Sequence, residues 1–384
     1  MKTVRLGLIG LGNMGKFHGA YLEQGKVQRC ELTAVASSSP KKLAAFPKMR
    51  HFGSGEELIE SGVVDAVLIC TPHYQHTTLG VAAFAQGLHV LVEKPVAVHV
   101  ADADKLMAAA QKADRRLGAM FQLRVEPRYL KVKQLIESGE LGAIVRFNWI
   151  ITDWFRTEAY YGSGGWRATW SGEGGGALLN QCPHQLDLLC WWLGLPQRVR
   201  GFCQFGRYHQ IEVEDNVTMY FDYASGATGV FITSTGEAPG TNRCEIAGER
   251  GKIVLENGKL FFTRNEVGMS EFSRTATSGF ARPSVWNIEI PTEPHAGPHA
   301  AVTQNFVDSI LDGVPLIASG SEGAASVQLA NAALYSAWTG ADVRLPLDAS
   351  AYAAALARRV AESTFTKAAT NVITQDDFSK SFTQ

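Results

Sequence analysis

The chain has 384 residues, 46% of them hydrophobic and 19% charged, a composition typical of a folded protein with one or two domains. The formal net charge of −1 gives no electrostatic reason to expect nucleic acid or an anionic membrane as a partner. No apolar run reaches the roughly 20 residues of a membrane span, and no signal peptide precedes the first predicted strand. The six cysteines are scattered without metal-type spacing, so we expect reduced thiols, no metal site and a cytoplasmic protein.

A glycine-rich loop between a predicted strand and a predicted helix begins the chain. The apolar run Val4–Ile9 predicts the strand, and the loop Gly10–Gly15 follows it with the spacing G-x-G-x-x-G. Such glycines allow a tight turn, the approach of a pyrophosphate to the backbone, and close packing of helix on strand. The helix that begins here would offer free N–H groups to the phosphates. We therefore predict dinucleotide contacts from Gly10, Gly12, Asn13, Met14 and Gly15, with a purely structural turn as the alternative.

The first third continues with alternating strands and helices, as in a doubly wound parallel sheet. Strands are predicted at 31–36, 65–70, 89–92 and 117–121, and helices near 56–61, 76–86 and 101–113. An acidic residue after the second strand would bind the ribose of NAD. The turn 37–42 has no carboxylate, and its side chains Ser37, Ser38 and Lys41 could accommodate a 2′-phosphate. The sequence predicts NAD or NADP with a slight preference for NADP; a serine-rich turn before a helix is the alternative.

Lys94 follows the apolar run 89–92 in the sequence Glu93-Lys94-Pro95. Because Pro95 cannot continue a central strand, Lys94 should lie at the carboxyl edge of the sheet, where open α/β sheets bind ligands. The loop that begins at Thr71 follows another strand end and should face the same crevice. The predicted contacts with the cofactor are Thr71, Pro72, His73, His76, Glu93 and Lys94, although either histidine could be a solvated loop residue.

After Pro127 the pattern changes to a helix near 129–138, a strand at 144–151 and later hairpins within 217–233 and 253–262. The segment 154–170 is glycine-rich and polar, yet unusually aromatic for a loop. Aromatic rings beside arginines suit sugars, which offer apolar faces and hydroxyl rims. Arg156 and Arg167 could also pair with a carboxylate, phosphate or sulfonate. A loop held by its own aromatic side chains, or a subunit contact, is the alternative.

The segment after Gly174–Gly176 carries Asn180, His184 and Asp187. If this segment is one helix, Asn180 and His184 lie one turn apart on the same face. An alcohol becomes a hydride donor only as its hydroxyl proton is withdrawn, and histidine has a suitable pKa for that exchange. Lys94 across the cleft could favour the developing alkoxide. Asp187 could orient His184 or could be a structural carboxylate.

These motifs, in this order, make the chain resemble the glucose–fructose oxidoreductase, inositol dehydrogenase and MocA (Gfo/Idh/MocA) family. The match includes Gly10–Gly15, Thr71-Pro72, Glu93-Lys94-Pro95, the run 174–187 and the run 305–310. The resemblance implies a Rossmann domain, followed by an α+β domain with a large, mostly antiparallel open sheet. It also implies hydride transfer between a nicotinamide and a sugar, polyol or related carbinol, with Lys94 as the catalytic lysine. Many family members have aspartate where this chain has Asn180, which cannot stabilise an imidazolium by charge.

We therefore expect a dinucleotide-binding Rossmann domain at 1–125, an α+β substrate-binding and oligomerisation domain at 126–363, and a polar C-terminal arm at 364–384. A sheet covered by helices on one face leaves the other free, which favours a homodimer or homotetramer. The predicted catalytic residues are Lys94, His184 and Asn180. The predicted substrate-binding residues are Arg124, Arg156, Tyr160, Trp166, Arg167, Asn180 and His184.

Three functions fit these residues. The first is an NAD(P)-dependent oxidoreductase acting on a hydroxyl of a sugar, polyol or glycoside. The second is an NAD-dependent glycosidase that works by transient oxidation, elimination, hydration and re-reduction, for instance on an anionic glycoside such as a sulfoquinovoside. This chemistry needs an extra base, for which Tyr160, Tyr161 or His73 could serve. The third is a non-catalytic NAD(P)-binding sensor, against which the presence of both Lys94 and His184 argues.

Overall fold

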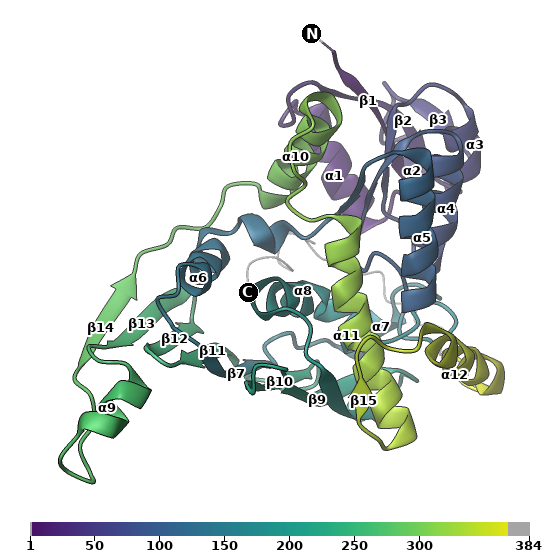
Figure 1. Ribbon diagram of the computed structural model, residues 1–384. Helices are drawn as coiled ribbons and strands as arrows, with labels where there is room; N and C mark the ends of the chain where they lie inside the picture. The colour runs from purple at the N-terminus through teal and green to yellow at the C-terminus, as the bar shows by residue number, and fades with distance from the viewer. Residues whose placement is uncertain (1, 368–384) are drawn as a thin grey trace.

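The computed structural model describes residues 2–367, which form two sheets with helices around and between them (Figure 1). In this range the first sheet has six strands, all parallel, in the order β3-β2-β1-β4-β5-β6. The strands are β1 (Val4–Ile9), β2 (Cys30–Ala36), β3 (Arg50–Phe52), β4 (Ala66–Ile69), β5 (His89–Val92) and β6 (Leu117–Ala119). The predicted doubly wound parallel sheet is confirmed.

The helices between these strands are α1 (Asn13–Glu23), α2 (Pro40–Leu43), α3 (Gly55–Glu60), α4 (Tyr74–Ala85) and α5 (Val100–Ala113). Strand β1 lies between β2 and β4, so the strand order reverses beside it. Ligands of open α/β sheets bind at this kind of reversal, outside the carboxyl ends of the strands. The loops that follow β1 and β4 therefore border the expected crevice.

The second sheet has nine strands among the described residues, in the order β14-β13-β12-β11-β7-β10-β9-β8-β15. Its strands are β7 (Ile144–Ile151), β8 (Arg198–Phe205), β9 (Glu214–Asp222), β10 (Thr228–Ser234), β11 (Asn242–Gly248), β12 (Gly251–Glu256), β13 (Lys259–Asn265), β14 (Val285–Ile290) and β15 (Val343–Arg344). Strands β7 and β10 pair in parallel, and the other neighbours pair antiparallel. The predicted large, mostly antiparallel sheet is confirmed.

Helices cover one face of this sheet, the face toward the first sheet (Figure 1). The remaining helices are α6 (Pro127–Glu137), α7 (Glu158–Gly162), α8 (Pro183–Leu193), α9 (Met269–Thr275), α10 (Pro298–Asp312), α11 (Gly320–Thr339) and α12 (Ala349–Glu362). The core between sheet and helices includes Trp149 of β7 stacked on Trp192 of α8, with ring centroids 5.7 Å apart. The other face remains open and exposes Phe202 and Tyr220. Helix α11 packs on both α8 and α5, and so joins the two parts.

The run 174–187 is not one helix, so the condition that would place Asn180 and His184 on one helical face is not met. A π-helical turn spans Ala177–Gln181, closed by a hydrogen bond from Cys182 N to Ala177 O, and α8 begins separately at Pro183. Proline has no N–H to continue the hydrogen-bond ladder, so a new helix starts there. Asn180 and His184 consequently belong to two different elements.

The wide turn is held by Glu214 of β9, a fully buried carboxylate that accepts hydrogen bonds from Gly176 N at 2.9 Å and Leu178 N at 3.0 Å. No helix within residues 2–367 combines the length and the apolar character that a membrane crossing requires. Most of the predicted C-terminal arm, from residue 368 on, lies outside the described residues.

Candidate active site

The glycine-rich loop has the geometry of a phosphate cradle. Gly10 has φ +92°, and a Cβ there would lie 2.7 Å from Cys70 O. A Cβ on Gly15 would lie 1.9 Å from Gly10 O, so helix α1 can approach β1 only with glycine at this position. A Cβ on Gly12, the N-cap of α1, would have no other atom within 4 Å. The backbone of Gly12 thus faces open space beside the free N–H groups of Asn13 and Met14, which fits a dinucleotide pyrophosphate.

The loop after β4 borders the same crevice. The buried hydroxyl of Thr71 has no hydrogen-bond partner among the described residues, so it can bind a ligand there. Neighbouring Pro72 is partly buried. His76 is used inside the protein instead, because its two ring nitrogens lie 2.8 Å from Thr71 O and 2.8 Å from Pro95 O. The expected cofactor contact by His76 is therefore replaced by a link between two loops.

His73 joins the cofactor side to the substrate side. It is buried, its Nδ1 lies 3.1 Å from Glu173 O, and its ring packs edge-on against Trp166 at 5.7 Å. Burial lowers the pKa of His73 well below its ordinary value. A neutral His73 that donates to Glu173 O is therefore a bridge between the loop after β4 and the substrate loop.

The turn after β2 leaves two of its predicted cofactor contacts at the surface. Ser38 and Lys41 are exposed, and the hydroxyl of Ser37 accepts a hydrogen bond from Ser39 N at 3.2 Å. No side chain of this turn is acidic. The geometry is compatible with either nucleotide.

The Glu93 carboxylate points into the protein rather than toward the crevice. It is 2.5 Å from His18 Nε2, while His18 Nδ1 lies 2.7 Å from Tyr21 Oη, which in turn lies 2.7 Å from Thr303 Oγ1 of α10. Burial alone would raise the pKa of Glu93, but the His18 hydrogen bond and nearby positive charge lower it to about 2. The ionised side chain of Glu93 therefore ties β5 to α1 and α10, in place of the expected cofactor contact.

Lys94 and His184 approach each other beside the end of β5. The Lys94 ammonium donates a 2.7 Å hydrogen bond to the backbone oxygen of Asn180. His184 is buried, its Nε2 lies 3.2 Å from Gln122 Nε2, and its Nδ1 has no partner in the part of the chain that the structure describes. Burial and the charge of Lys94 both lower the pKa of His184 well below its ordinary value. A neutral imidazole with an unused nitrogen therefore stands near an ammonium group.

Asp187 and Arg124 pair with each other, which gives Asp187 the structural role that was one of its two expected roles. Asp187 accepts two hydrogen bonds from Arg124, 2.8 Å from Nε and 2.7 Å from Nη2. Arg124 also donates to Ile317 O and to Glu322, and both members of the pair are 1% exposed. The Asp187 carboxylate is bound to Arg124 and not to His184, and all three guanidinium nitrogens of Arg124 have partners within the protein, so the predicted substrate contact by Arg124 stays a prediction that this geometry does not favour.

The predicted substrate loop forms a stack of arginines and aromatic rings. The Arg156 guanidinium lies 5.1 Å from the rings of Trp154 and Tyr160, and Arg167 lies 4.4 Å from Tyr160 and 4.8 Å from Trp166. The Nε atoms of both arginines are buried without a partner among residues 2–367. The charges of Arg167 and Arg156 contribute, after burial, to a lowered pKa of Lys94, so all three cations face one region.

Two residues of this region were not predicted. Gln122 follows β6, at the same carboxyl edge as Lys94, so the rule that located Lys94 could have found it. Glu173 is a single acidic residue inside the glycine run 172–176, and its Oε1 lies 3.8 Å from Arg167 Nη1. An acidic residue alone among glycines after an aromatic loop is the signal that could have identified it.

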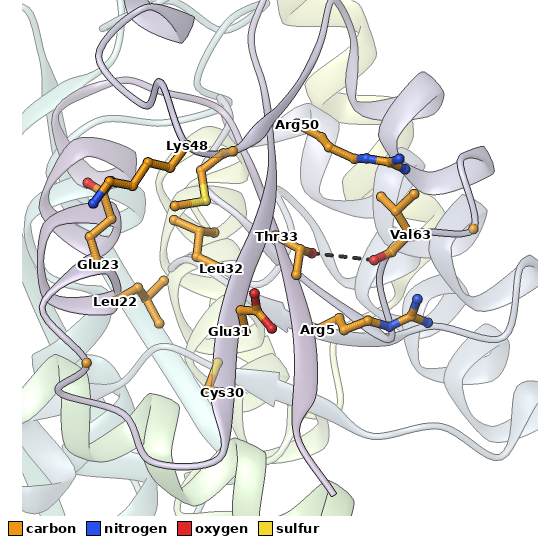
Figure 2. Close-up of a pocket in the computed structure, with 13 residues that line it drawn as sticks. Arg5, Leu22, Glu23, Cys30, Glu31, Leu32, Thr33, Lys48, Arg50 and Val63 are labelled. Carbon is orange, nitrogen blue, oxygen red and sulfur yellow. Dashed lines mark hydrogen bonds between the residues drawn. The ribbon is translucent and has the colours of Figure 1, made fainter.

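A separate surface cavity of about 590 Å³ is lined by Arg5, Cys30 and Arg50, which lie at the amino ends of β1, β2 and β3, the edge of the first sheet opposite to the candidate site. Figure 2 shows its lining residues. The cavity surrounds the start of β2, from Cys30 to Thr33, whose hydroxyl donates to Val63 O, and Lys48 also lines it. None of the predicted site residues borders this cavity. The candidate active site therefore lies at the carboxyl edge, away from it.

Comparisons with known proteins point to one family. Residues 4–121 match the model "Oxidoreductase family, NAD-binding Rossmann fold", and residues 129–254 match "GFO/IDH/MocA C-terminal domain". The chain is 26% identical to myo-inositol 2-dehydrogenase of Thermotoga maritima over 66% of this chain and 75% of that protein. It is 24% identical to inositol 2-dehydrogenase of Rhizobium meliloti over 87% and 97% of the two chains. The solved WlbA dehydrogenase of Bordetella pertussis, in complex with NADH and UDP-GlcNAcA, is 27% identical, with 90% and 100% coverage and a TM-score of 0.76.

Proposed function

The chain belongs to the Gfo/Idh/MocA family of NAD(P)-dependent oxidoreductases, and we propose that it transfers a hydride between NAD and a hydroxyl-bearing carbon of an anionic sugar or glycoside. The observation that carries this proposal is the buried, neutral His184, with an unused Nδ1, beside the ammonium of Lys94. When bound, NAD supplies the hydride acceptor, and Gly10, Gly12 and Thr71 would hold it.

In this mechanism His184 takes the hydroxyl proton at Nδ1. That atom offers a lone pair when Nε2 carries the proton and donates to Gln122. In the structure the Gln122 amide presents its nitrogen to His184 Nε2, so this mechanism requires the amide to turn over. The reversed amide also gives a partner to Gln122 Oε1, which otherwise has none in the described range. A histidine held neutral by burial can accept the proton at neutral pH.

Lys94 polarises the reacting oxygen. Its ammonium has three donors, and among residues 2–367 only Asn180 O accepts from it, so two donors remain for the hydroxyl as it becomes an alkoxide. The side chain of Asn180 positions the same hydroxyl. Tyr160 and Trp166 would pack on the apolar face of the sugar.

Arg156 and Arg167 favour an anionic group on the substrate. Their guanidinium planes are held by aromatic rings, and each keeps a buried Nε without a partner among residues 2–367. Planar donors fixed in this way suit a carboxylate or sulfonate. The similar WlbA structure holds a sugar derivative, UDP-GlcNAcA, which supports a sugar as substrate here.

The test is a panel of matched neutral and anionic sugars and aryl glycosides, each assayed with NAD and with NADP. Reduced cofactor and released aglycone are followed together. We expect reduced cofactor to accumulate, with kcat/KM at least about tenfold higher for carboxylated or sulfonated substrates than for neutral ones. Equal rates on both classes would remove the anion from the proposal. The same assays decide between NAD, which the WlbA structure holds as NADH, and the NADP preference predicted from the turn after β2.

The redox glycosidase is a second candidate, favoured by the environment of Tyr160. Its phenol oxygen accepts hydrogen bonds from Arg167 at 2.6 Å and from Gln181 at 3.0 Å, an arrangement suited to the extra base of an elimination. Tyr161 is a poorer candidate because it is buried against Thr235. Aglycone released without net reduced cofactor would establish this function.

We further propose a homodimer or homotetramer that buries the open face of the second sheet, where Val145, Phe202 and Tyr220 are exposed. The division into a Rossmann domain at 1–125 and a substrate domain at 126–363 is part of the same proposal. Sedimentation of the purified protein tests the oligomer, and a monomer at micromolar concentration would exclude it.

A further inference from the structure

Glu173 is a buried carboxylate in a region dominated by cations. It is 1% exposed, and its Oε2 accepts a 2.5 Å hydrogen bond from Ala168 N. Its Oε1 accepts a hydrogen bond from the side-chain nitrogen of Asn180 and lies 3.8 Å from Arg167 Nη1. Burial raises the pKa of Glu173, whereas Arg167, Ala168 N–H and Asn180 act in the opposite direction, so these partners offset part of the cost of a charge at this depth.

The loop around Glu173 is built to keep this side chain in place. A Cβ on Gly172 would lie 2.1 Å from Trp166 O, and a Cβ on Gly174, which has φ +77°, would lie 2.1 Å from Val98 Cγ1. Both neighbours of Glu173 must therefore be glycine for the loop to close this tightly. The carbonyl of Glu173 is also fixed, by the hydrogen bond with His73.

The hydrogen bond with Glu173 determines which way the Asn180 amide faces. A carboxylate accepts only, so Asn180 must direct its NH₂ toward Glu173 and its oxygen the other way. The backbone oxygen of the same residue receives the Lys94 ammonium at 2.7 Å. Glu173, Asn180 and Lys94 thus form one connected chain that ends at the proposed reacting oxygen.

We propose that Glu173 is the positioning carboxylate of this reaction: it orients Asn180 as a hydrogen-bond acceptor for the substrate and keeps Lys94 charged. This inference rests on the proposed function. Burial lowers the pKa of Lys94, and Arg167 and Arg156 lower it further, whereas Glu93 and Glu173 oppose that shift. Glu93 is the larger of the two opposing influences and is itself paired with His18, whereas Glu173 is the one on the substrate side, so removing its charge should also favour loss of the Lys94 proton.

A charge exchange tests the assignment. Glu173→Gln removes the charge and offers both a donor and an acceptor, so either the NH₂ or the oxygen of Asn180 can face residue 173. The oxygen of Asn180 is then no longer held toward the substrate, and kcat should fall on the order of a hundredfold, as for other losses of positioning. Asn180→Asp alone places two carboxylates in contact and should also reduce kcat. The double variant Glu173→Gln/Asn180→Asp restores one carboxylate beside one amide and should recover most of the activity.

The dependence of kcat on pH distinguishes a positioning role of Glu173 from a role in holding the loop alone. In Glu173→Gln the alkaline limb of kcat should move to lower pH, because Lys94 loses its proton more easily, and it should return in the double variant. NADH affinity, measured by fluorescence, should stay within about twofold throughout, since the glycine-rich loop is untouched. A double variant no more active than the single variants, or an unmoved alkaline limb, would overturn the assignment.

A measurement without substrate keeps this inference separate from the proposed function. NMR titration of isotope-labelled lysine, with Lys94→Ala for assignment, should show a lower Lys94 pKa in Glu173→Gln than in the wild type.

If Glu173→Gln fails to fold, Glu173→Asp is the second variant, because it retains the charge but shortens the side chain. It should keep the wild-type titration of Lys94 and lose kcat. A Lys94 titration that is the same in the wild type and in Glu173→Gln, or is displaced in Glu173→Asp, would refute the role of Glu173 even if no sugar were ever turned over. Failure of every substrate with a shifted Lys94 titration would instead refute the proposed function alone.

Discussion

The two sides of the candidate site are built in different ways. On the cofactor side, Gly10, Thr71 and Lys94 each lie just after a parallel strand, so the pattern of the local sequence determines where they are. On the substrate side, Glu173, Asn180 and Arg167 lie in irregular segments held by contacts between distant residues. The His73–Glu173 hydrogen bond joins residues 100 apart in the chain, and the Lys94–Asn180 bond joins residues 86 apart.

This difference shows which kind of functional residue a single sequence reveals. A strand end fixes a residue to within a few ångströms because the sheet geometry is regular. A loop residue is fixed only after its remote partners are known, and polar partners leave little trace in hydrophobic periodicity. Variants of the two sides should therefore fail in different ways.

The largest effect is expected at the strand end. Lys94→Ala removes the group that stabilises the developing alkoxide, so kcat should fall on the order of a thousandfold, while NADH binding persists because the glycine-rich loop is intact. Single-turnover reduction of NAD and NADH fluorescence measure the two quantities. Lys112→Ala, an exposed lysine on α5, is the matched control and should behave as the wild type. Retained turnover in Lys94→Ala would refute the assignment of Lys94.

A stability loss is expected at Asp187, for which the sequence left open a role beside His184 or a structural role. Asp187→Ala leaves the buried Arg124 without its bidentate partner, which should cost about 3–5 kcal/mol of unfolding free energy in urea denaturation. The matched control is Asp342→Ala, whose partner Arg198 is exposed, and it should cost less than about 1 kcal/mol. Equal losses in the two variants would refute the structural role of the buried pair, and an Asp187→Ala protein with normal stability and a raised KM would support the predicted role of Arg124 in substrate binding.

Much of the fold could be predicted because it depends on regular patterns. The apolar runs that became β1, β4 and β5 and the glycine spacing after β1 are local signals, and the structure follows them. Pro183 is a local signal for a new helix start, because proline has no N–H to continue the preceding turn. The Arg124–Asp187 pair and the Glu173–Asn180 contact could not be read, because each joins residues that only the tertiary fold brings together.

The glycine-rich loop separates a binding role from a structural role at neighbouring positions. Gly12→Val adds a side chain where nothing lies within 4 Å, so stability should be unchanged, but the side chain occupies the space of a pyrophosphate. NADH binding should weaken by about 1–3 kcal/mol, measured by fluorescence titration, as expected for overpacking.

Gly15→Ala should instead destabilise the protein, because its Cβ would lie 1.9 Å from Gly10 O. Gly279→Val, in an open exposed loop, is the control for both; unchanged NADH affinity in Gly12→Val would place the dinucleotide elsewhere.

The smallest effect is expected for the influence of the Lys94 charge on the pKa of His184. Burial and, after it, the Lys94 ammonium are the two largest causes that hold the pKa of His184 below its ordinary value of 6.5, and His299 adds to them. A nearby positive charge disfavours a second one, so Lys94→Met should raise the pKa of His184, while burial keeps it below 6.5. NMR titration of the histidine ring measures this shift without any substrate, and Lys112→Met serves as the control. An upward shift would mean that Lys94, placed by a strand end, and His184, placed by a helix start, act as one proton-exchanging unit. If the titration does not move, the two groups do not sense each other, and the proposed division of proton transfer and oxygen polarisation between them fails.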